Sequence, residues 1–322
     1  MSKQLGGNHL GLAISDQFLS ACQIQKSLSG QSKLTSWGNI NLPTGAVVNG
    51  HIKENNLVID KLKHLLNHPT IGKFTTNLVV ASLPLASSFL CTVKIPLSQS
   101  DKVKDLIITE ISPQLPIHVK SASLVWHDVN KMPNLGLQEV TVMAAPTELL
   151  ATYQKILQKT QLIPLAFEHE VMALTRTIKG VNDKIIILIN DNNHSSSISL
   201  IKQGVVQSSQ IIESKSPAPK TTHSQPKKKI LLTKKITTTL PWPKIIQQTL
   251  ASYQEYHNSY IIPDEIYLMG SKMNKAAAQK ITQVLKTPTK YVNPWQGVKY
   301  PKDINVQTLT AYNTCLGLAL YK

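Results

Sequence analysis

The histidines and carboxylates of this chain form few spacings that could support chemistry. Asp60, His64 and His68 recur at every fourth residue, which predicts three side chains on one face of a helix. Three successive turns of a straight helix cannot converge on one tetrahedral zinc ion without a ligand from elsewhere. We interpret the triplet as a solvated polar face, and we expect no metal site. The other histidines have no evident carboxylate or nucleophile partner, so no catalytic residue is predicted.

Phosphate-binding and hydrolase signatures are missing as well. Gly72 and Lys73 are adjacent, but Phe74 follows them and Asn67 stands five residues before Gly72, so no GxxxxGK[ST] loop is present. No GxGxxG follows a predicted strand, and no GxSxG or HExxH occurs. The sequence therefore carries none of the common motifs of P-loop or Rossmann nucleotide-binding proteins, serine hydrolases or zinc proteases.

The charge balance is strongly basic but poor in arginine. Lys and Arg total 34 against 18 acidic residues, a formal net charge of +16, and Arg176 is the single arginine of the 322 residues. Arginine supplies the planar fork that reads guanine edges and phosphates. The aromatic content of 5% leaves few side chains on which nucleic-acid bases could stack. A sequence-specific nucleic-acid reader is therefore excluded. Cys22, Cys91 and Cys315 lie far apart in apolar stretches, which predicts buried thiols in a reducing compartment.

Two stretches of the chain share one pattern. Residues 9–42 and 184–213 each alternate as three short strands joined by tight turns. Their similarity predicts an internal duplication, and therefore an α/β protein with two related lobes and a cleft between them. A strand, a helix and two further strands over 89–146 predict a small inserted β-α-β-β subdomain.

These patterns set the expected domain limits. We expect the first lobe to comprise residues 1–88 and 147–180 and the second lobe residues 181–322. Residues 213–241 include a Lys-, Pro- and Ser-rich stretch that buries little, which predicts a linker or solvated loop. No apolar leader segment opens the chain and no apolar run is long enough to span a bilayer, so we expect a cytosolic protein or one peripheral to a membrane.

With this organisation, nearly the whole chain resembles the type IV pilus assembly protein PilM family, actin-like (ribonuclease H-like) relatives of the cell-division protein FtsA. The resemblance rests on several stretches in the right order: LGLAISDQFLSACQIQKS, LPTGAVVNGHIKENNLVIDKLKHLL, ITEISPQLPI, VTVMAAPTELLATYQKILQKTQLIPLAFEHEVMALTR, YVNPWQGV and LGLAL. It implies a two-lobed actin-like fold, with the linker replacing most of a helical subdomain of the second lobe.

The resemblance also locates the loops that hold nucleotide in actin-like ATPases, and this chain departs from the family there. The family's Asp-Ile-Gly of the first loop is matched by Ala13, Ile14 and Ser15, and that of the second by Leu188, Ile189 and Asn190; a Ser-Gly-Gly-Gly is matched from Met269 to Lys272. The matching loop residues are Ser15, Asp16, Gln17, Asn190, Asp191, Gly270 and Ser271. Loss of both carboxylates and most glycines removes the magnesium site and the close backbone approach to phosphate. We expect a degenerate site with neither ATPase activity nor a cofactor; binding of Mg-ATP as a switch is the alternative.

The resemblance implies a scaffold of a type IV pilus or competence-pseudopilus platform, at the cytoplasmic face of the bacterial inner membrane. Its partner would be the N-terminal tail of a PilN-like membrane protein, held between the first lobe and the inserted subdomain, with pilus motor ATPases as possible further partners. Candidate contact residues are Glu110, Leu115 and Pro116. The Lys-rich linker either assists contact with anionic lipid or only solubilises the chain. Nonspecific nucleic-acid binding through the same lysines remains a further alternative.

Overall fold

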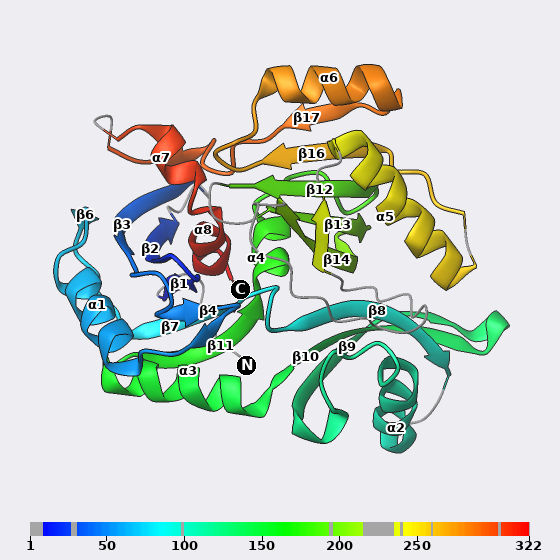
Figure 1. Ribbon diagram of the computed structural model, residues 1–322, viewed down its shortest axis with the longest axis horizontal. Coiled ribbons are helices and arrows are strands. Elements are labelled where there is room, and N and C mark those ends of the chain that lie inside the picture. Colours follow the sequence, from blue (N-terminus) through cyan, green and yellow to red (C-terminus); the bar gives the residue numbers. More distant parts are fainter. Residues whose placement is uncertain are drawn as a thin grey trace.

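The protein folds into two lobes of similar topology and a small third unit (Figure 1). The computed structural model describes residues 9–26, 31–97, 100–192, 196–214, 235–238, 241–258, 260–301 and 304–321.

The first lobe is built on a mixed sheet whose described strands run in the order β11-β7-β1-β2-β3-β18, with β6 paired to β3. Its strands are β1 (Leu10–Ile14), β2 (Phe18–Lys26), β3 (Ser32–Asn41), β6 (Ile71–Gly72), β7 (Leu78–Leu83), β11 (Ile163–His169) and β18 (Val298–Lys299). A two-residue hairpin, β4 (Val47–Val48) and β5 (His51–Ile52), precedes α1 (Asn55–Asn67), and α3 (Thr147–Lys159) packs beside it. Helix α1 forms because Val58, Leu62 and Leu65 repeat at helical spacing and bury one face.

The second lobe repeats this plan. Its strands β12 (Ile185–Asp191), β13 (Ser196–Lys202) and β14 (Val205–Ser214) form an antiparallel meander, as β1 to β3 do. Strands β16 (Glu265–Met269) and β17 (Thr289–Tyr291) then add in parallel beside β12, as β7 and β11 add beside β1. Helices α5 (Trp242–His257) and α6 (Lys275–Leu285) cover this sheet (Figure 1). The duplication inferred from the two meanders is therefore present in the topology.

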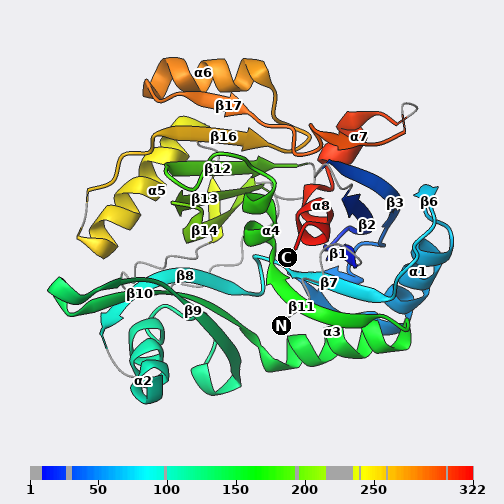
Figure 2. The same cartoon turned by 180° about the vertical axis from the view of Figure 1, so that it is seen from behind.

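The third unit is a three-stranded sheet with one helix. Strands β8 (Phe89–Pro96), β9 (Ala122–Met132) and β10 (Leu137–Pro146) pair in the order β8-β10-β9, and α2 (Ser100–Ile111) packs on β8. Short 3-10 turns at Val119–Ser121 and Pro133–Leu135 flank β9. Its apolar side chains join the core of the second lobe, so this inserted subdomain shares one core with the β12–β14 sheet. Figure 2 shows β8 of the inserted sheet running below β14.

The C-terminal part of the chain belongs to the first lobe, which corrects the expectation that all of 181–322 forms the second. This part of the chain forms two short helices, α7 (Val306–Thr310) and α8 (Asn313–Ala319). Helix α8 lies against β1, where a Cβ on Gly11 would come within 2.2 Å of the Cys315 carbonyl oxygen. It also lies against α4 (Glu170–Arg176), where a Cβ on Gly317 would come within 2.0 Å of the Ala173 carbonyl oxygen. Glycine is required at both positions for this close approach.

The linker expected over 213–241 is also shorter than its predicted limits. Strand β14 continues to Ser214, and β15 (Lys235–Thr238) pairs with it in parallel. Pairing to an existing sheet edge provides backbone hydrogen bonds. The amino-acid composition, from which the linker was predicted, carries no information on such pairing. Residues 215–234, which carry most of the lysines of this region, lie outside the described residues. The three cysteines are buried and unpaired, as predicted.

Candidate functional site

The first expected nucleotide loop is the turn from β1 to β2, and its hydrogen bonds are internal. Ser15 Oγ accepts from the backbone N–H groups of Gln17 at 3.3 Å and Phe18 at 3.0 Å, and it donates to the Phe18 carbonyl at 3.0 Å. Asp16 turns away from the turn to the β4–β5 hairpin, where its carboxylate accepts from the N–H groups of Asn49 at 2.7 Å and Gly50 at 2.8 Å. The carboxylate expected to lie at a phosphate position instead holds a neighbouring loop.

The other two expected loops lie together at the end of the second sheet. Asn190 pairs with Met269, which brings the end of β12 next to the turn after β16. Asn192 Oδ1 accepts from the N–H of Ser271 at 2.9 Å, and the Asp191 carbonyl accepts from the N–H of Lys272 at 3.0 Å. A Cβ on Gly270 would lie 2.4 Å from the Asp191 carbonyl oxygen, so the two loops are in direct contact.

Two groups beside the first loop have altered acidities. Burial raises the pKa of Glu170, at the start of α4, to about 7, and the nearby Asp16 adds to the shift; the N–H of Leu85 donates to its Oε1 at 3.0 Å. Tyr153 is buried and donates to the Gly50 carbonyl at 3.0 Å, and burial raises its pKa. Asp16 was expected in a loop, but its proximity to Tyr153 and Glu170 was not, because these residues come from separate segments that only the fold brings together.

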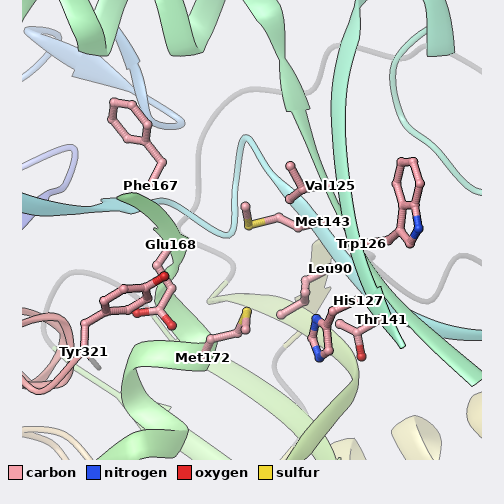
Figure 3. A pocket seen from close by; sticks show the side chains of 10 residues that line it. All are labelled: Leu90, Val125, Trp126, His127, Thr141, Met143, Phe167, Glu168, Met172 and Tyr321. Carbon is pink, nitrogen blue, oxygen red and sulfur yellow. The ribbon is translucent and has the colours of Figure 1, made fainter. Parts of the chain in front are cut away.

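A cavity of about 190 Å³ separates the inserted subdomain from the first lobe (Figure 3). One wall is formed by β9 and β10, where Val125 pairs with Met143 and His127 pairs with Thr141 on one face of the sheet. The opposite wall carries Phe167 of β11, together with residues of α4 and the C-terminal segment; the lining residues are Leu90, Val125, Trp126, His127, Thr141, Met143, Phe167, Glu168, Met172 and Tyr321. Figure 3 shows Val125, Met143, Met172 and Phe167 around this space, whereas Trp126 lies on the far side of β9.

Both walls end in strand edges. In the described part of the chain, β9 is the outer strand of the inserted sheet and β11 is the outer strand of the first sheet. Such an edge presents backbone N–H and C=O groups that an added strand can pair with. Val125 is 56% exposed on β9, and Leu165 is 47% exposed on β11, so apolar side chains accompany these edges.

The wall formed by β11 and α4 is fixed by the only arginine. The Arg176 guanidinium forms a fork with the Glu168 carboxylate, with Nη1 2.8 Å from Oε2, and Nη1 also donates to the Gly317 carbonyl at 2.8 Å. Its Cζ lies 5.2 Å from the centre of the Tyr321 ring. These contacts join β11, α4 and the end of α8, and they hold this wall of the cavity rigid.

The residues expected to contact a partner do not line this cavity. Glu110, at the end of α2, accepts from the Tyr256 hydroxyl at 3.0 Å, and so links the inserted subdomain to α5 of the second lobe. Leu115 packs against the core that these two units share. Pro116 lines a different cavity of about 400 Å³, together with Ser87 and Ser209, between the lobes. The side chains that line the cavity beside β9 are set by the strand register of β9 and β10, which the sequence does not specify.

Among the described residues, no group of three or more His, Cys, Asp or Glu side chains is arranged to hold a metal ion. No helix in the same part of the chain is long and apolar enough to cross a membrane.

Comparison with known proteins identifies the fold. No protein-family model and no curated protein sequence matches the chain. Among solved structures, the chain matches one from the PilM–PilN type IV pilus biogenesis complex with a TM-score of 0.71 and 18% identity, covering 97% of this chain and 98% of that one. It also matches the cytoplasmic domain of EpsL, an inner-membrane component of the type II secretion system of Vibrio cholerae, with a TM-score of 0.50, 8% identity and 98% coverage of both chains. The fold is thus the actin-like fold of PilM, as expected.

Proposed function

We propose that this chain, which has the PilM fold over nearly its whole length, is a scaffold of a type IV pilus or related assembly platform. Its partner in this proposal is a PilN-like membrane protein, whose cytoplasmic N-terminal tail lies between the inserted subdomain and the first lobe. The match to a structure of a PilM–PilN complex supports this partner. The observation that carries the proposal is the apolar cavity between the β9 and β11 edges.

The cavity suits an extended peptide. Backbone groups along a strand edge provide hydrogen bonds to any sequence, and adjoining apolar pockets select side chains at alternate positions. Here the β9 and β11 edges provide the backbone groups, and Met143, Phe167 and Met172 provide the apolar pocket. Methionine side chains adapt to the shape of an apolar ligand at little cost. An acid–base pair is not needed for this function.

We infer further that the nucleotide site is degenerate and that the chain is not an ATPase. A phosphate cradle requires backbone N–H groups that point at the ligand. The N–H groups of Gln17, Phe18 and Ser271 already have acceptors within the chain, and Asp16 binds the neighbouring loop. The residues present therefore do not fit Mg-ATP in this arrangement, which supports a function that depends on peptide binding.

A cytoplasmic position at the inner membrane follows from this proposal. The partner's tail would hold the scaffold at the membrane, and the formal charge of +16 would add weak attraction to anionic lipid. Salt would weaken that attraction, because exposed charges are screened within about 10 Å at 0.1 M ionic strength.

A charge placed in the cavity tests the proposal. Val125→Glu puts a carboxylate on an exposed position of β9, so the fold should tolerate it. Leu135→Glu is the matched control, because Leu135 is 68% exposed at the far end of the same hairpin, roughly 20 Å along the strand. We expect the labelled tail peptide of the PilN-like protein to bind the wild type and L135E equally, and V125E at least tenfold more weakly, by fluorescence polarisation. Equal binding to V125E, or no binding to the wild type, would overturn the proposal.

A further inference from the structure

The cavity beside β9 continues into a second cavity that reaches the other lobe. The second cavity has a volume of about 360 Å³ and shares His127, Thr141 and Met172 with the first. Its far wall is formed by Asn182 and by the hairpin from Gly204 to Val206, all from the second lobe. The groove defined by the two cavities therefore touches both lobes and the inserted subdomain.

A chain of buried hydrogen bonds fixes the wall of the second cavity. Thr141 Oγ1 of β10 lies 2.8 Å from Thr92 Oγ1 of β8, and Thr92 Oγ1 donates to the Val206 carbonyl of β14 at 2.9 Å. Both threonines are buried, so breaking this chain would leave polar groups without partners. The inserted subdomain and the second lobe consequently form one continuous wall along the groove.

The two cavities differ in chemistry. The first is mainly apolar around Leu90, Met143 and Phe167. The residues that line the second include Arg176, Asn182 and His127, and none of its lining residues is acidic. Arg176 donates three hydrogen bonds, two to the Glu168 carboxylate and one to the Gly317 carbonyl. A guanidinium has five N–H donors, so two remain that bond to no other described residue.

We propose that the partner's tail spans both cavities, with an apolar side chain in the first and a carboxylate-bearing side chain in the second. This inference rests on the proposed function and adds to it the chemistry of the tail and a role for the second lobe. The shared residues His127, Thr141 and Met172 make the path continuous. The carboxylate meets donors on Arg176 and Asn182, and Glu168, which pairs with two other donors of Arg176, lines the first cavity and not the second. The bound tail then holds the two lobes and the inserted subdomain together.

Two variants in the second lobe test this inference by calorimetric titration with the tail peptide. Val205→Trp fills the second cavity from its far wall, and Val284→Trp, on the exposed face of α6, is the control for bulk. Asn182→Asp places a carboxylate opposite that of the peptide, at an exposed position where the fold should tolerate it. We expect V205W to weaken binding at least tenfold, N182D to weaken it three- to tenfold, and V284W to leave it unchanged.

The matching peptide variants carry each Asp or Glu of the tail changed in turn to its amide. We expect one of these changes to weaken binding to the wild type and to add no further loss with N182D, as expected for two groups that interact. If V205W, N182D and all amide peptides bind like the wild type while V125E does not bind, the second cavity has no role and only this inference fails. If the peptide does not bind the wild type, or binds V125E normally, the proposed function fails with it.

Discussion

Asn192 Oδ1 lies 2.9 Å from the backbone nitrogen of Ser271, so a side chain from the β12–β13 connection closes the turn that follows β16. In a nucleotide-binding actin-like protein, that turn would face the ligand. Here it is bonded to its own chain, and the Lys272 N–H is likewise bonded to the Asp191 carbonyl.

We expect Asn192→Ala to lower the free energy of unfolding by about 1–3 kcal/mol, because the bond to the Ser271 N–H and the buried bond from Asn192 Nδ2 to Asn190 Oδ1 are both lost. Ser271→Ala keeps that N–H and is the matched control, for which we expect no change. Urea denaturation measures both values. Equal destabilisation by the two substitutions would show that the side chain of Ser271, and not the bond to Asn192, stabilises the turn.

Asp16 stabilises the first lobe through two charge-assisted hydrogen bonds to the β4–β5 hairpin. We therefore expect Asp16→Ala to lower the free energy of unfolding by about 1.5–3 kcal/mol. Asp16→Asn keeps one acceptor and should cost less. Denaturation at pH 7 gives both values, with the exposed Thr44→Ala as control. A neutral Asp16→Ala substitution would contradict a structural role for this carboxylate.

Glu170 should make stability depend on pH in the opposite sense to an ion-paired carboxylate. Burial raises its pKa to about 7, so between pH 4.5 and 7 the folded protein keeps a proton that the unfolded chain releases. Stability from this group is therefore lost as the pH rises through that interval. We expect Glu170→Gln, which keeps the acceptor for the Leu85 N–H, to raise the free energy of unfolding by about 2–3 kcal/mol at pH 8 and by clearly less at pH 5.

Glu265 provides the contrasting control. Burial raises the pKa of Glu265, but hydrogen bonds from Lys290, Tyr267 and Lys184 outweigh burial and lower it to about 2. Its contribution is present at neutral pH and is lost as the pH falls from 4.5 towards 2. Glu265→Gln should therefore destabilise the protein at pH 8, where Glu170→Gln stabilises it. The same sign for both substitutions would contradict the account of Glu170.

Arg176 joins three segments, and lysine should not replace it. Arg176→Met leaves the buried Glu168 carboxylate without its partner, and we expect a loss of about 3 kcal/mol or more in urea denaturation. Arg176→Lys keeps the charge but not the fork, so it should be intermediate. A double-mutant cycle with Glu168→Gln should show that most of the loss is shared. Additive losses would mean that the pair does not act as a unit.

The topology could be predicted from the sequence because it depends on local alternation. Strands such as β1 and β12 are short apolar runs, and tight turns join them to the next strand, so both meanders were visible. The lobe to which the C-terminal helix belongs was not predictable. The apolar residues of α8 indicate burial, but the contact that places the helix joins Gly11 to Cys315, 304 residues apart.

The candidate site was less predictable than the fold. Glu110 and Pro116 stood out because they match a family pattern, and their role in partner contact stays a prediction; in the structure Glu110 contacts α5 and Pro116 lines a separate cavity. The groove beside β9 depends on the pairing of Val125 with Met143 and on the approach of β11. Such contacts arise from register and from the packing of distant segments, neither of which leaves a short motif.

The most direct measurement is a pair of calorimetric titrations of the purified protein, one with the N-terminal tail peptide of the PilN-like protein and one with Mg-ATP. The account predicts saturable binding of the peptide, unchanged when Mg-ATP is present, and no binding of Mg-ATP alone. Micromolar binding of Mg-ATP, or a peptide that binds only in its presence, would contradict the account and make the cleft a nucleotide switch.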